Sequence, residues 1–283
     1  MAKRAVLIGV NRYRMPGSDL RGCVNDIKNM QATLTQRYGF KKSDIVTLLD
    51  FAASKKAMQA AIRALVRGGR RGDVLLVHFS GHGSNVPDDD DHRDEADGRD
   101  EILCPADLDW KDPFRDDWLR STIDGLKARV NLTVITDCCH SGTITRAVQP
   151  PDAPVIARYL PSPWELAEAE SGRRPRGRVQ SGQRRSAPAA RKARDIVPAD
   201  LPEVLITGCR DTQTSADAMI AGTYNGALTY HLVAAIKQAK PGVTYRQLHD
   251  ATIARLKRSR FDQVPQLEGS RARLDQPFLS PIE

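Results

Sequence analysis

The chain has 283 residues, which is enough for one large α/β domain or two small ones with a substantial hydrophobic core. Its formal net charge is +8, but nine Arg or Lys and only two Asp lie in residues 171–200. The remaining 34 basic and 33 acidic residues nearly balance, so the basic character belongs to one segment. Overall charge therefore does not argue for a nucleic-acid-binding function.

The five cysteines point away from a disulfide-stapled protein. Their number is odd and Cys138 and Cys139 are adjacent, which fits neither a disulfide framework nor a zinc knuckle. Such usage is typical of a reducing compartment. No apolar run approaches the ~20 residues that a membrane span needs, and the first apolar run is too short for a secretory signal. We expect a cytoplasmic protein with no membrane association.

Short apolar runs alternate with amphipathic segments along the chain. Runs rich in Val, Ile and Leu predict buried strands at 4–10, 44–49, 73–79, 131–136, 203–207 and 263–267. Apolar residues at helical spacing predict helices at 19–38, 54–67, 117–128, 226–240 and 245–257, the second of them capped by Ser54. This alternation predicts an α/β fold, with a mainly parallel β-sheet and helices on both faces.

Two segments interrupt this pattern. Residues 81–100 are polar and rich in Asp, and we expect them to form a loop. Residues 150–200 are rich in Pro, Arg, Ser, Gly and Ala and poor in large apolar side chains. Such a composition predicts a flexible, mostly unstructured loop.

Two of the predicted strands end in reactive residues. His82 follows the third strand, and Cys139 follows the fourth. The carboxyl ends of parallel strands form the ligand crevice of an open sheet, so neighbouring strands would bring these two side chains together. An imidazole beside a thiol is sufficient for nucleophilic catalysis, because thiolate is a strong nucleophile.

The residues around His82 and Cys139 fit this chemistry. Gly81 and Gly83 permit a tight turn and close approach of the backbone to a substrate. The N–H groups of Gly83 and Cys139 could both face a developing oxyanion. Taken singly, a His after a strand is usually structural, and adjacent cysteines are usually buried small hydrophobes. A zinc site of His82, Cys138, Cys139 and His140 is disfavoured because ligands adjacent in one short turn do not easily reach tetrahedral positions.

Four ordered motifs resemble one family. They are residues 22–26 (GCVND), 80–83 (SGHG), 137–142 (DCCHSG) and 208–217 (GCRDTQTSAD), and the last continues into 224–229 (YNGALT). Together they are similar to the metacaspases and, more closely, to their prokaryotic relatives, the orthocaspases. The resemblance implies a caspase-like three-layer sandwich. It also implies that residues 1–150 correspond to the large catalytic subunit and residues 201–283 to the small one, joined by a flexible basic linker at 151–200.

The resemblance also implies roles for individual residues. His82 corresponds to the catalytic base and Cys139 to the nucleophile of a cysteine endopeptidase. Cys138 occupies a position where the family often has a small residue, so we assign it to packing, with a role as the nucleophile as the alternative.

Metacaspases cleave after Arg or Lys, and a cationic side chain needs carboxylates to pair with. Asp26 and Asp137 match family positions that line the acidic specificity pocket. Ser80 is a polar neighbour, and Asp217 is a further candidate. The alternative for Asp26 is a helix cap or surface charge, and the alternative for Asp137 is a turn-forming residue.

An enzyme that cleaves after Arg could cleave its own basic linker. Arg174, Arg185 and Arg194 are candidates for self-cleavage, because a flexible Arg-rich segment is accessible to proteolysis. The alternative is that this segment binds an acidic partner or nucleic acid. Residues 171–200 contain no aromatic side chain for base stacking, which argues against nucleic acid.

Calcium is the one ion that the acidic residues suggest. Residues 88–101 carry nine carboxylates, a density of hard oxygen ligands that suits Ca²⁺. Asp97, Asp116 and Asp117 match family calcium ligands, but a further family Asp falls at Arg146. The alternative is a solvated acidic loop. The thiol chemistry itself needs no cofactor.

The sequence thus predicts a cysteine endopeptidase that acts on protein or peptide substrates after Arg or Lys and processes itself in the linker. The family implies a monomer. Two alternatives remain: a catalytically silent caspase-fold adaptor, and a basic nucleic-acid-associated protein whose binding would be salt-dependent and lost with residues 171–200.

Overall fold

The central feature of the computed structural model, which describes residues 1–88, 98–140, 153–171, 201–210 and 213–282, is a six-stranded sheet. Its strand order is β12-β9-β7-β3-β1-β2, and every neighbouring pair is parallel except β12 with β9. The strands are β1 (Lys3–Gly9), β2 (Ile45–Leu49), β3 (Val74–Ser80), β7 (Asn131–Asp137), β9 (Glu203–Thr207) and β12 (Gln266–Glu268).

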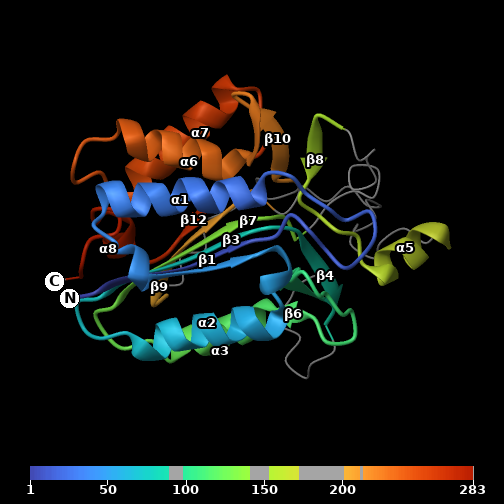
Figure 1. Ribbon diagram of the computed structural model, residues 1–283, viewed down its shortest axis with the longest axis horizontal. Helices are drawn as coiled ribbons and strands as arrows, with labels where there is room; N and C mark the ends of the chain where they lie inside the picture. The colour runs from blue at the N-terminus through green and yellow to red at the C-terminus, as the bar shows by residue number, and fades with distance from the viewer. Residues whose placement is uncertain (89–97, 141–152, 172–200, 211–212, 283) are drawn as a thin grey trace, which may run out of the picture.

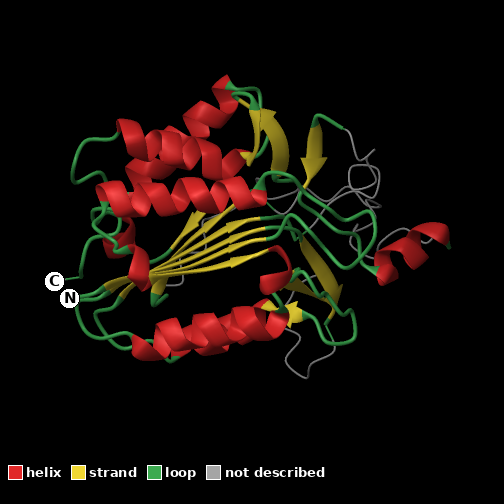
Figure 2. Ribbon diagram, viewed as in Figure 1, coloured by secondary structure: helices red, strands yellow, loops and turns green. Residues whose placement is uncertain are grey.

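Helices cover both faces of this sheet (Figures 1 and 2). One face carries α1 (Cys23–Arg37), α6 (Ala227–Gln238) and α7 (Tyr245–Arg258), and the other carries α2 (Lys55–Gly68) and α3 (Asp116–Asp124). Short helical turns at Lys42–Asp44, Asp50–Ala52 and α8 (Arg271–Leu274) complete the connections.

The sequence of β1 explains the two cores, because successive strand residues point to opposite faces. Val6 and Ile8 join the cluster under α2 and α3, and Ala5 and Leu7 join the cluster under α1 and α6. Apolar side chains on both faces make the strand a continuous hydrophobic run. The predicted three-layer sandwich is confirmed.

The predicted boundaries differ mostly at the ends of elements. The Ser54 cap is confirmed, since its hydroxyl accepts a hydrogen bond from Ala57 N–H at 3.3 Å. The first helix begins at Cys23 rather than at residue 19. The residues just before it are held instead by Asp217, whose carboxylate accepts hydrogen bonds from the N–H groups of Arg21 and Gly22 at 2.6 and 3.1 Å.

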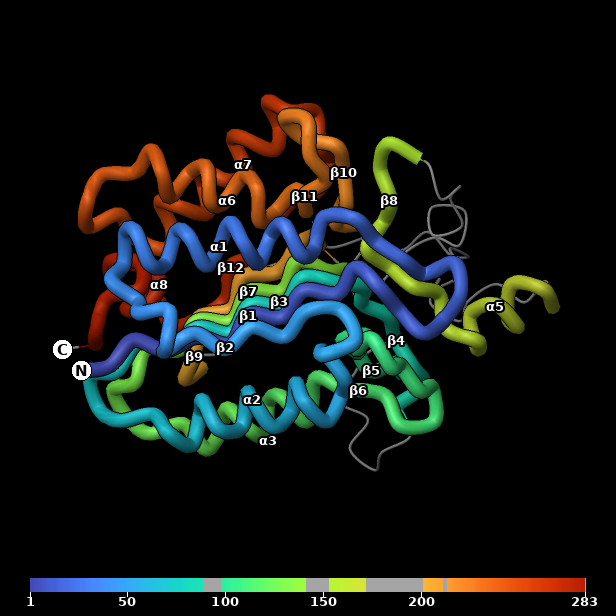
Figure 3. The backbone as a smooth tube through the Cα atoms, viewed as in Figure 1, coloured from blue at the N-terminus to red at the C-terminus, as the bar shows by residue number. Residues whose placement is uncertain are grey.

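Two small sheets lie beyond the carboxyl ends of the central strands (Figure 3). One is β4 (Gly83–Pro87), β5 (Arg99–Leu103) and β6 (Phe114–Arg115), and the other is β8 (Val155–Ala157), β10 (Ala216–Ile220) and β11 (Thr223–Gly226). The expectation of a loop over 81–100 is wrong at its ends, because β4 and β5 pair there. The signal for β4 is weak, since only Val86 of its five residues is strongly strand-forming.

The segment expected to be a flexible linker is partly ordered. Residues 153–171 contain β8 and helix α5 (Pro163–Glu170), so the prediction of a loop over 150–200 is wrong there. Ser162 and Glu165 form a capping box around Pro163 at the helix start, a local signal that the sequence carries. Residues 172–200, with Arg174, Arg185 and Arg194, lie outside the described residues.

None of the helices in the described part of the chain is long and apolar enough to cross a membrane. All five cysteines are buried and unpaired.

Candidate active site

The register of the central sheet places His82 and Cys139 at the same edge. Ser80 at the end of β3 pairs with Asp137 at the end of β7, and the two reactive residues each follow two positions later. Gly83 lies so close to this turn that a methyl group on it would collide with the carbonyl of Cys139. The glycine after His82 is therefore a steric requirement of the close approach.

The His82 ring is neutral, and one hydrogen bond fixes its tautomer. Its Nε2 lies 2.9 Å from the carbonyl oxygen of Ser18, and a carbonyl can only accept, so Nε2 carries the hydrogen. This leaves Nδ1 with its lone pair free, and that buried atom has no hydrogen-bond partner within the described residues. Burial lowers the pKa of His82 to about 4, so the ring is uncharged at neutral pH.

Cys139 is buried beside β10 and Cys209. Its Sγ accepts a hydrogen bond from the backbone N–H of Ser215, and the side chain packs with Cys209 and Tyr159. Burial raises the pKa of the Cys139 thiol well above its usual range, although the Ser215 N–H opposes this. In this state the pair is a neutral thiol and a neutral imidazole.

The two N–H groups predicted to bind the oxyanion donate hydrogen bonds to the same atom. The amides of Gly83 and Cys139 each donate to the backbone carbonyl oxygen of Arg158, both at 3.1 Å. Two converging donors are the geometry that stabilises negative charge developing on a carbonyl oxygen. The carbonyl oxygen of Arg158 is therefore held by the two donors predicted to bind an oxyanion.

The side chain of the same residue fills the predicted acidic pocket. The Arg158 guanidinium is fully buried and donates to Asp26 Oδ2 and to Ser80 Oγ, both at 2.8 Å. Further oxygens lie at 3.3 Å on Asp137 and 4.0 Å on Asp217. All four residues predicted for substrate binding thus surround one arginine.

Each carboxylate of the pocket is held by other donors. Asp26 accepts from Ser80 Oγ at 2.7 Å and from Gly226 N–H at 2.9 Å. Asp137 accepts from Ser215 Oγ at 2.6 Å and from the Thr229 hydroxyl at 2.7 Å. These bonds fix the carboxylates before any guanidinium enters, which lowers the entropic cost of binding one.

Burial and charge compete in this pocket. Burial raises the pKa of Asp26 to about 7, although the neighbouring Arg158 guanidinium lowers it. Burial also disfavours the charge of Arg158, but Asp137, Asp26 and Asp217 outweigh this and raise its pKa. Gly226 closes the wall, since a side chain there would collide with Asp137 and the guanidinium.

The backbone around Arg158 runs like a bound peptide. Strand β8 pairs antiparallel with β10, with Ala157 opposite Ala216 and Val155 opposite Ala218. Arg158 N–H donates to the Ser215 carbonyl at 2.9 Å, and Leu160 N–H donates to the Gly83 carbonyl at 3.0 Å. Addition of a strand to a sheet edge is a common mode of peptide recognition.

Sequence reasoning missed Arg158 and this segment. Arg158 lies outside the basic cluster of 171–200, in an otherwise apolar run (VIARYL) within a region expected to be unstructured. The β-branched pair Val155-Ile156, two residues before a single Arg, was the available signal.

The predicted calcium residues are only partly described. Asp97 lies outside the described residues, while Asp116 and Asp117 form the first turn of α3. Burial and the neighbouring carboxylate of Glu101 raise the pKa of Asp116 to about 6. Within the described residues no group of three or more His, Cys, Asp or Glu is arranged to hold a metal, including the set considered for zinc. Cys138 is buried in the core, and its Sγ lies 3.6 Å from His140 Nε2.

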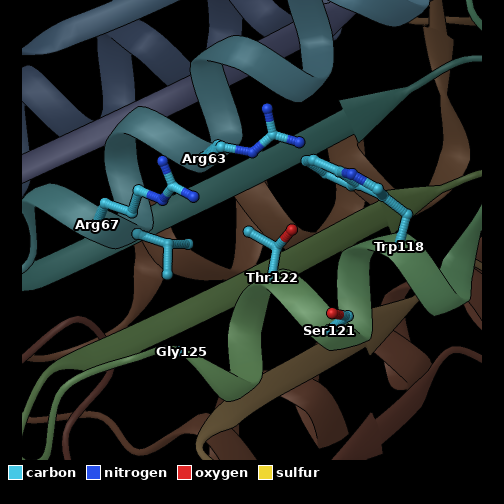
Figure 4. Close-up of a pocket in the computed structure, with 7 residues that line it drawn as sticks. Arg63, Arg67, Trp118, Ser121, Thr122 and Gly125 are labelled. Carbon is cyan, nitrogen blue, oxygen red and sulfur yellow. The ribbon is translucent and has the colours of Figure 1, made fainter.

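A hollow of about 400 Å³ opens elsewhere, between α2 and α3 (Figure 4). Arg63 and Arg67 reach over it from α2, and Trp118 and Thr122 face them from α3. No His, Cys or carboxylate lines it. The candidate active site, in contrast, is filled by residues 155–160.

Comparison with solved structures defines the fold class. A Geobacter sulfurreducens protein matches the whole of both chains with 26% identity and a TM-score of 0.67. Caspase-1 from Spodoptera frugiperda matches 94% of this chain and 85% of its own, with 12% identity and a TM-score of 0.53. The fold is therefore the caspase-like α/β sandwich.

Sequence comparison defines the family. The metacaspase, peptidase C14 domain matches residues 3–147. Metacaspase-1 of Cryptococcus neoformans and metacaspase-1A of Neurospora crassa are 35% and 33% identical over 95% of this chain, which spans 62% and 63% of their lengths. Metacaspase-1 of Pyricularia oryzae is 35% identical, with 72% of its length matched. The chain belongs to the metacaspase family of cysteine peptidases, which confirms the resemblance seen in its motifs.

Proposed function

We propose that this chain is a cysteine endopeptidase that cleaves polypeptides after Arg, and less readily after Lys, with Cys139 as the nucleophile and His82 as the base. One observation supports this most strongly. Arg158 has its guanidinium among three carboxylates while its carbonyl oxygen accepts hydrogen bonds from both Gly83 and Cys139 N–H. A peptide cleaved after Arg needs both arrangements at once.

The chemistry follows from the protonation of the pair. The thiol proton of Cys139 passes to the free Nδ1 of His82 as Sγ attacks the carbonyl carbon, and Gly83 and Cys139 N–H stabilise the oxyanion. The peptide C–N bond breaks as His82 returns the proton to the leaving amine, which gives a thioester on Cys139. Water then attacks the thioester with His82 as base, the C–S bond breaks, the proton returns to Cys139 Sγ, and the product departs with a free carboxyl group.

The preference for Arg over Lys rests on the number and placement of carboxylates. A planar guanidinium presents several donors, and two of its nitrogens are used toward Asp26, Ser80 and Asp137. A Lys ammonium has its charge at one point and cannot span these partners equally well. We expect slower cleavage after Lys and none after Asp, which three carboxylates would repel.

The Arg158–Tyr159 bond is itself a candidate for self-processing. It lies between the parts that resemble the large and small subunits, and it is bound as a substrate would be. Self-cleavage after Arg174, Arg185 or Arg194 also remains a prediction. The second function, a catalytically silent adaptor, is favoured by one feature: the peptide-binding cleft is filled by the chain's own residues.

Mass spectrometry of the purified full chain, together with peptide hydrolysis, tests the proposal. We expect fragments that end at Arg158 or at an Arg of residues 172–200, together with hydrolysis of a fluorogenic Arg peptide. Both should be absent for Cys139→Ala and for His82→Ala. An intact chain that never hydrolyses the Arg peptide would contradict the proposal and favour the adaptor.

A further inference from the structure

The residue after Arg158 occupies a pocket of its own. The Tyr159 side chain is 1% exposed and packs with Cys139 and Cys209. Its backbone pairs with Gly83 at the start of β4, whose carbonyl accepts from Leu160 N–H. The pocket therefore lies on the far side of the bond from the acidic pocket, beside β4.

The end of this pocket recognises a hydroxyl group. Asn85 Nδ2 lies 3.0 Å from the Tyr159 hydroxyl oxygen. The orientation of the amide is determined by its other end, because Arg99 Nη1 lies 2.8 Å from Oδ1 and a guanidinium can only donate. Nδ2 also lies 3.0 Å from the His140 carbonyl oxygen and 3.2 Å from Glu165 Oε1, so several partners fix the position of the amide.

The pocket can be divided into wall and occupant. Gly83, Asn85, Cys139 and Cys209 belong to the peptidase body. Tyr159 belongs to the segment after the bond, and so does Glu165 of α5, whose carboxylate accepts a hydrogen bond from the Tyr159 hydroxyl. A separate substrate would lack Glu165, but it would still meet the Asn85 amide and the two sulfur-containing side chains.

We propose that Asn85 and the side chains around Tyr159 form a binding site for the residue that follows the cleaved bond, and that this site selects tyrosine. The inference rests on the proposed function, and it narrows the preferred substrate to Arg–Tyr bonds. The aromatic ring supplies buried area against Cys139 and Cys209, and the hydroxyl oxygen accepts one hydrogen bond from Asn85 Nδ2.

Three internally quenched peptides that differ only in the residue after Arg test this site. The enzyme is the full chain, with both fragments of any self-cleavage retained. One neutral hydrogen bond leads us to expect about a fivefold higher kcat/KM for Tyr than for Phe, and burial of the ring leads us to expect about a tenfold higher value for Phe than for Ala.

Asn85→Ala separates recognition from a structural role. We expect the ratio of the Tyr to the Phe peptide to fall to about one, while the ratio of Phe to Ala persists. Equal loss on all three peptides would show that Asn85 only supports the fold, and would overturn the proposal.

A fourth peptide tests the Asn85 contact without a substitution in the enzyme. O-methyltyrosine places a methyl group against Asn85, so it should be cleaved more slowly than Phe. Cleavage of all four peptides at one rate would overturn the pocket but leave the proposed function standing. No cleavage of any of them, with the chain folded, would overturn both.

Discussion

The two pockets on either side of the Arg158–Tyr159 bond differ in the forces they use. On the Arg158 side, three buried carboxylates face one guanidinium. On the Tyr159 side, one amide donor and two cysteine side chains of the peptidase body surround a neutral ring, whose hydroxyl donates to Glu165 of its own segment. Both pockets are closed to solvent, so the difference is one of charge and not of burial.

This difference sets the size of effect that each pocket can have. A buried charge that loses its partner costs about 3–5 kcal/mol, because the remaining charge is desolvated and unpaired. A neutral hydrogen bond is worth only about 1 kcal/mol. For the proposed function, we therefore expect the acidic pocket to determine whether a bond is cleaved and the tyrosine pocket to change only the rate of cleavage.

Removal of one carboxylate from the acidic pocket should have the largest effect. Asp26→Asn takes away the closest carboxylate of the guanidinium, at 2.8 Å. We expect kcat/KM for an Arg peptide to fall by about 100-fold, the equivalent of ~3 kcal/mol. Asp275→Asn, which removes an exposed ion pair with Arg246, serves as the matched control and should change little. A loss of threefold or less for Asp26→Asn would contradict the charge-based account.

Substitution of Arg158 should have the next largest effect. Arg158→Gln keeps a side chain of similar length but removes the charge, so self-cleavage at this bond should stop while hydrolysis of an added Arg peptide begins without a lag. Arg158→Lys should still be cut, about tenfold more slowly. Intact-mass measurement over time follows the first effect, and a continuous fluorescence assay follows the second. If Arg158→Gln still produced a fragment ending at residue 158 at the same rate, the assignment of the Arg158–Tyr159 bond as a self-cleavage site would be wrong.

The two pockets should respond differently to pH. The pKa of Asp26 is raised to about 7, so its carboxyl loses its proton as the pH rises through neutrality. Only the charged form attracts a guanidinium. The ratio of kcat/KM for an Arg peptide to that for a citrulline peptide should therefore rise between pH 6 and 8, whereas the ratio for Tyr to Phe after the bond should stay flat. Ionisation of Cys139 cancels in both ratios. In Asp26→Asn the first ratio should become flat as well.

Calcium should have the smallest effect. Burial and Glu101 raise the pKa of Asp116 to about 6, and a divalent cation there would favour the ionised carboxylates. For a weak site we expect 5 mM Ca²⁺ to add about 1 kcal/mol of stability and to raise the melting temperature by ~2–3 °C. Differential scanning calorimetry with calcium and with chelator measures this. Asp116→Asn should abolish the shift, and a shift that persists in this variant would place the ion elsewhere.

The elements with strong local signals could be predicted from the sequence. The strand ends that carry His82 and Cys139 follow from apolar runs whose residues pack on both faces of the sheet. Asp26 and Asp137 were found through motifs, and they do meet in one pocket. Arg158 and Asn85 could not be found in this way, because their partners lie far away in the sequence. Arg158 meets Asp26 across 132 residues, and Asn85 meets Tyr159 across 74.

The acidic pocket is shared between the two ends of the sequence. Asp26 and Asp137 come from the part that also holds His82 and Cys139, while Asp217 and the Gly226 amide come from the part after residue 200. A chain folded only as far as β7 would contain His82 and Cys139, but its acidic pocket would lack Asp217 and the Gly226 amide. The proposed selectivity for Arg would therefore require the last third of the protein to be in place, because the guanidinium has its full set of partners only then.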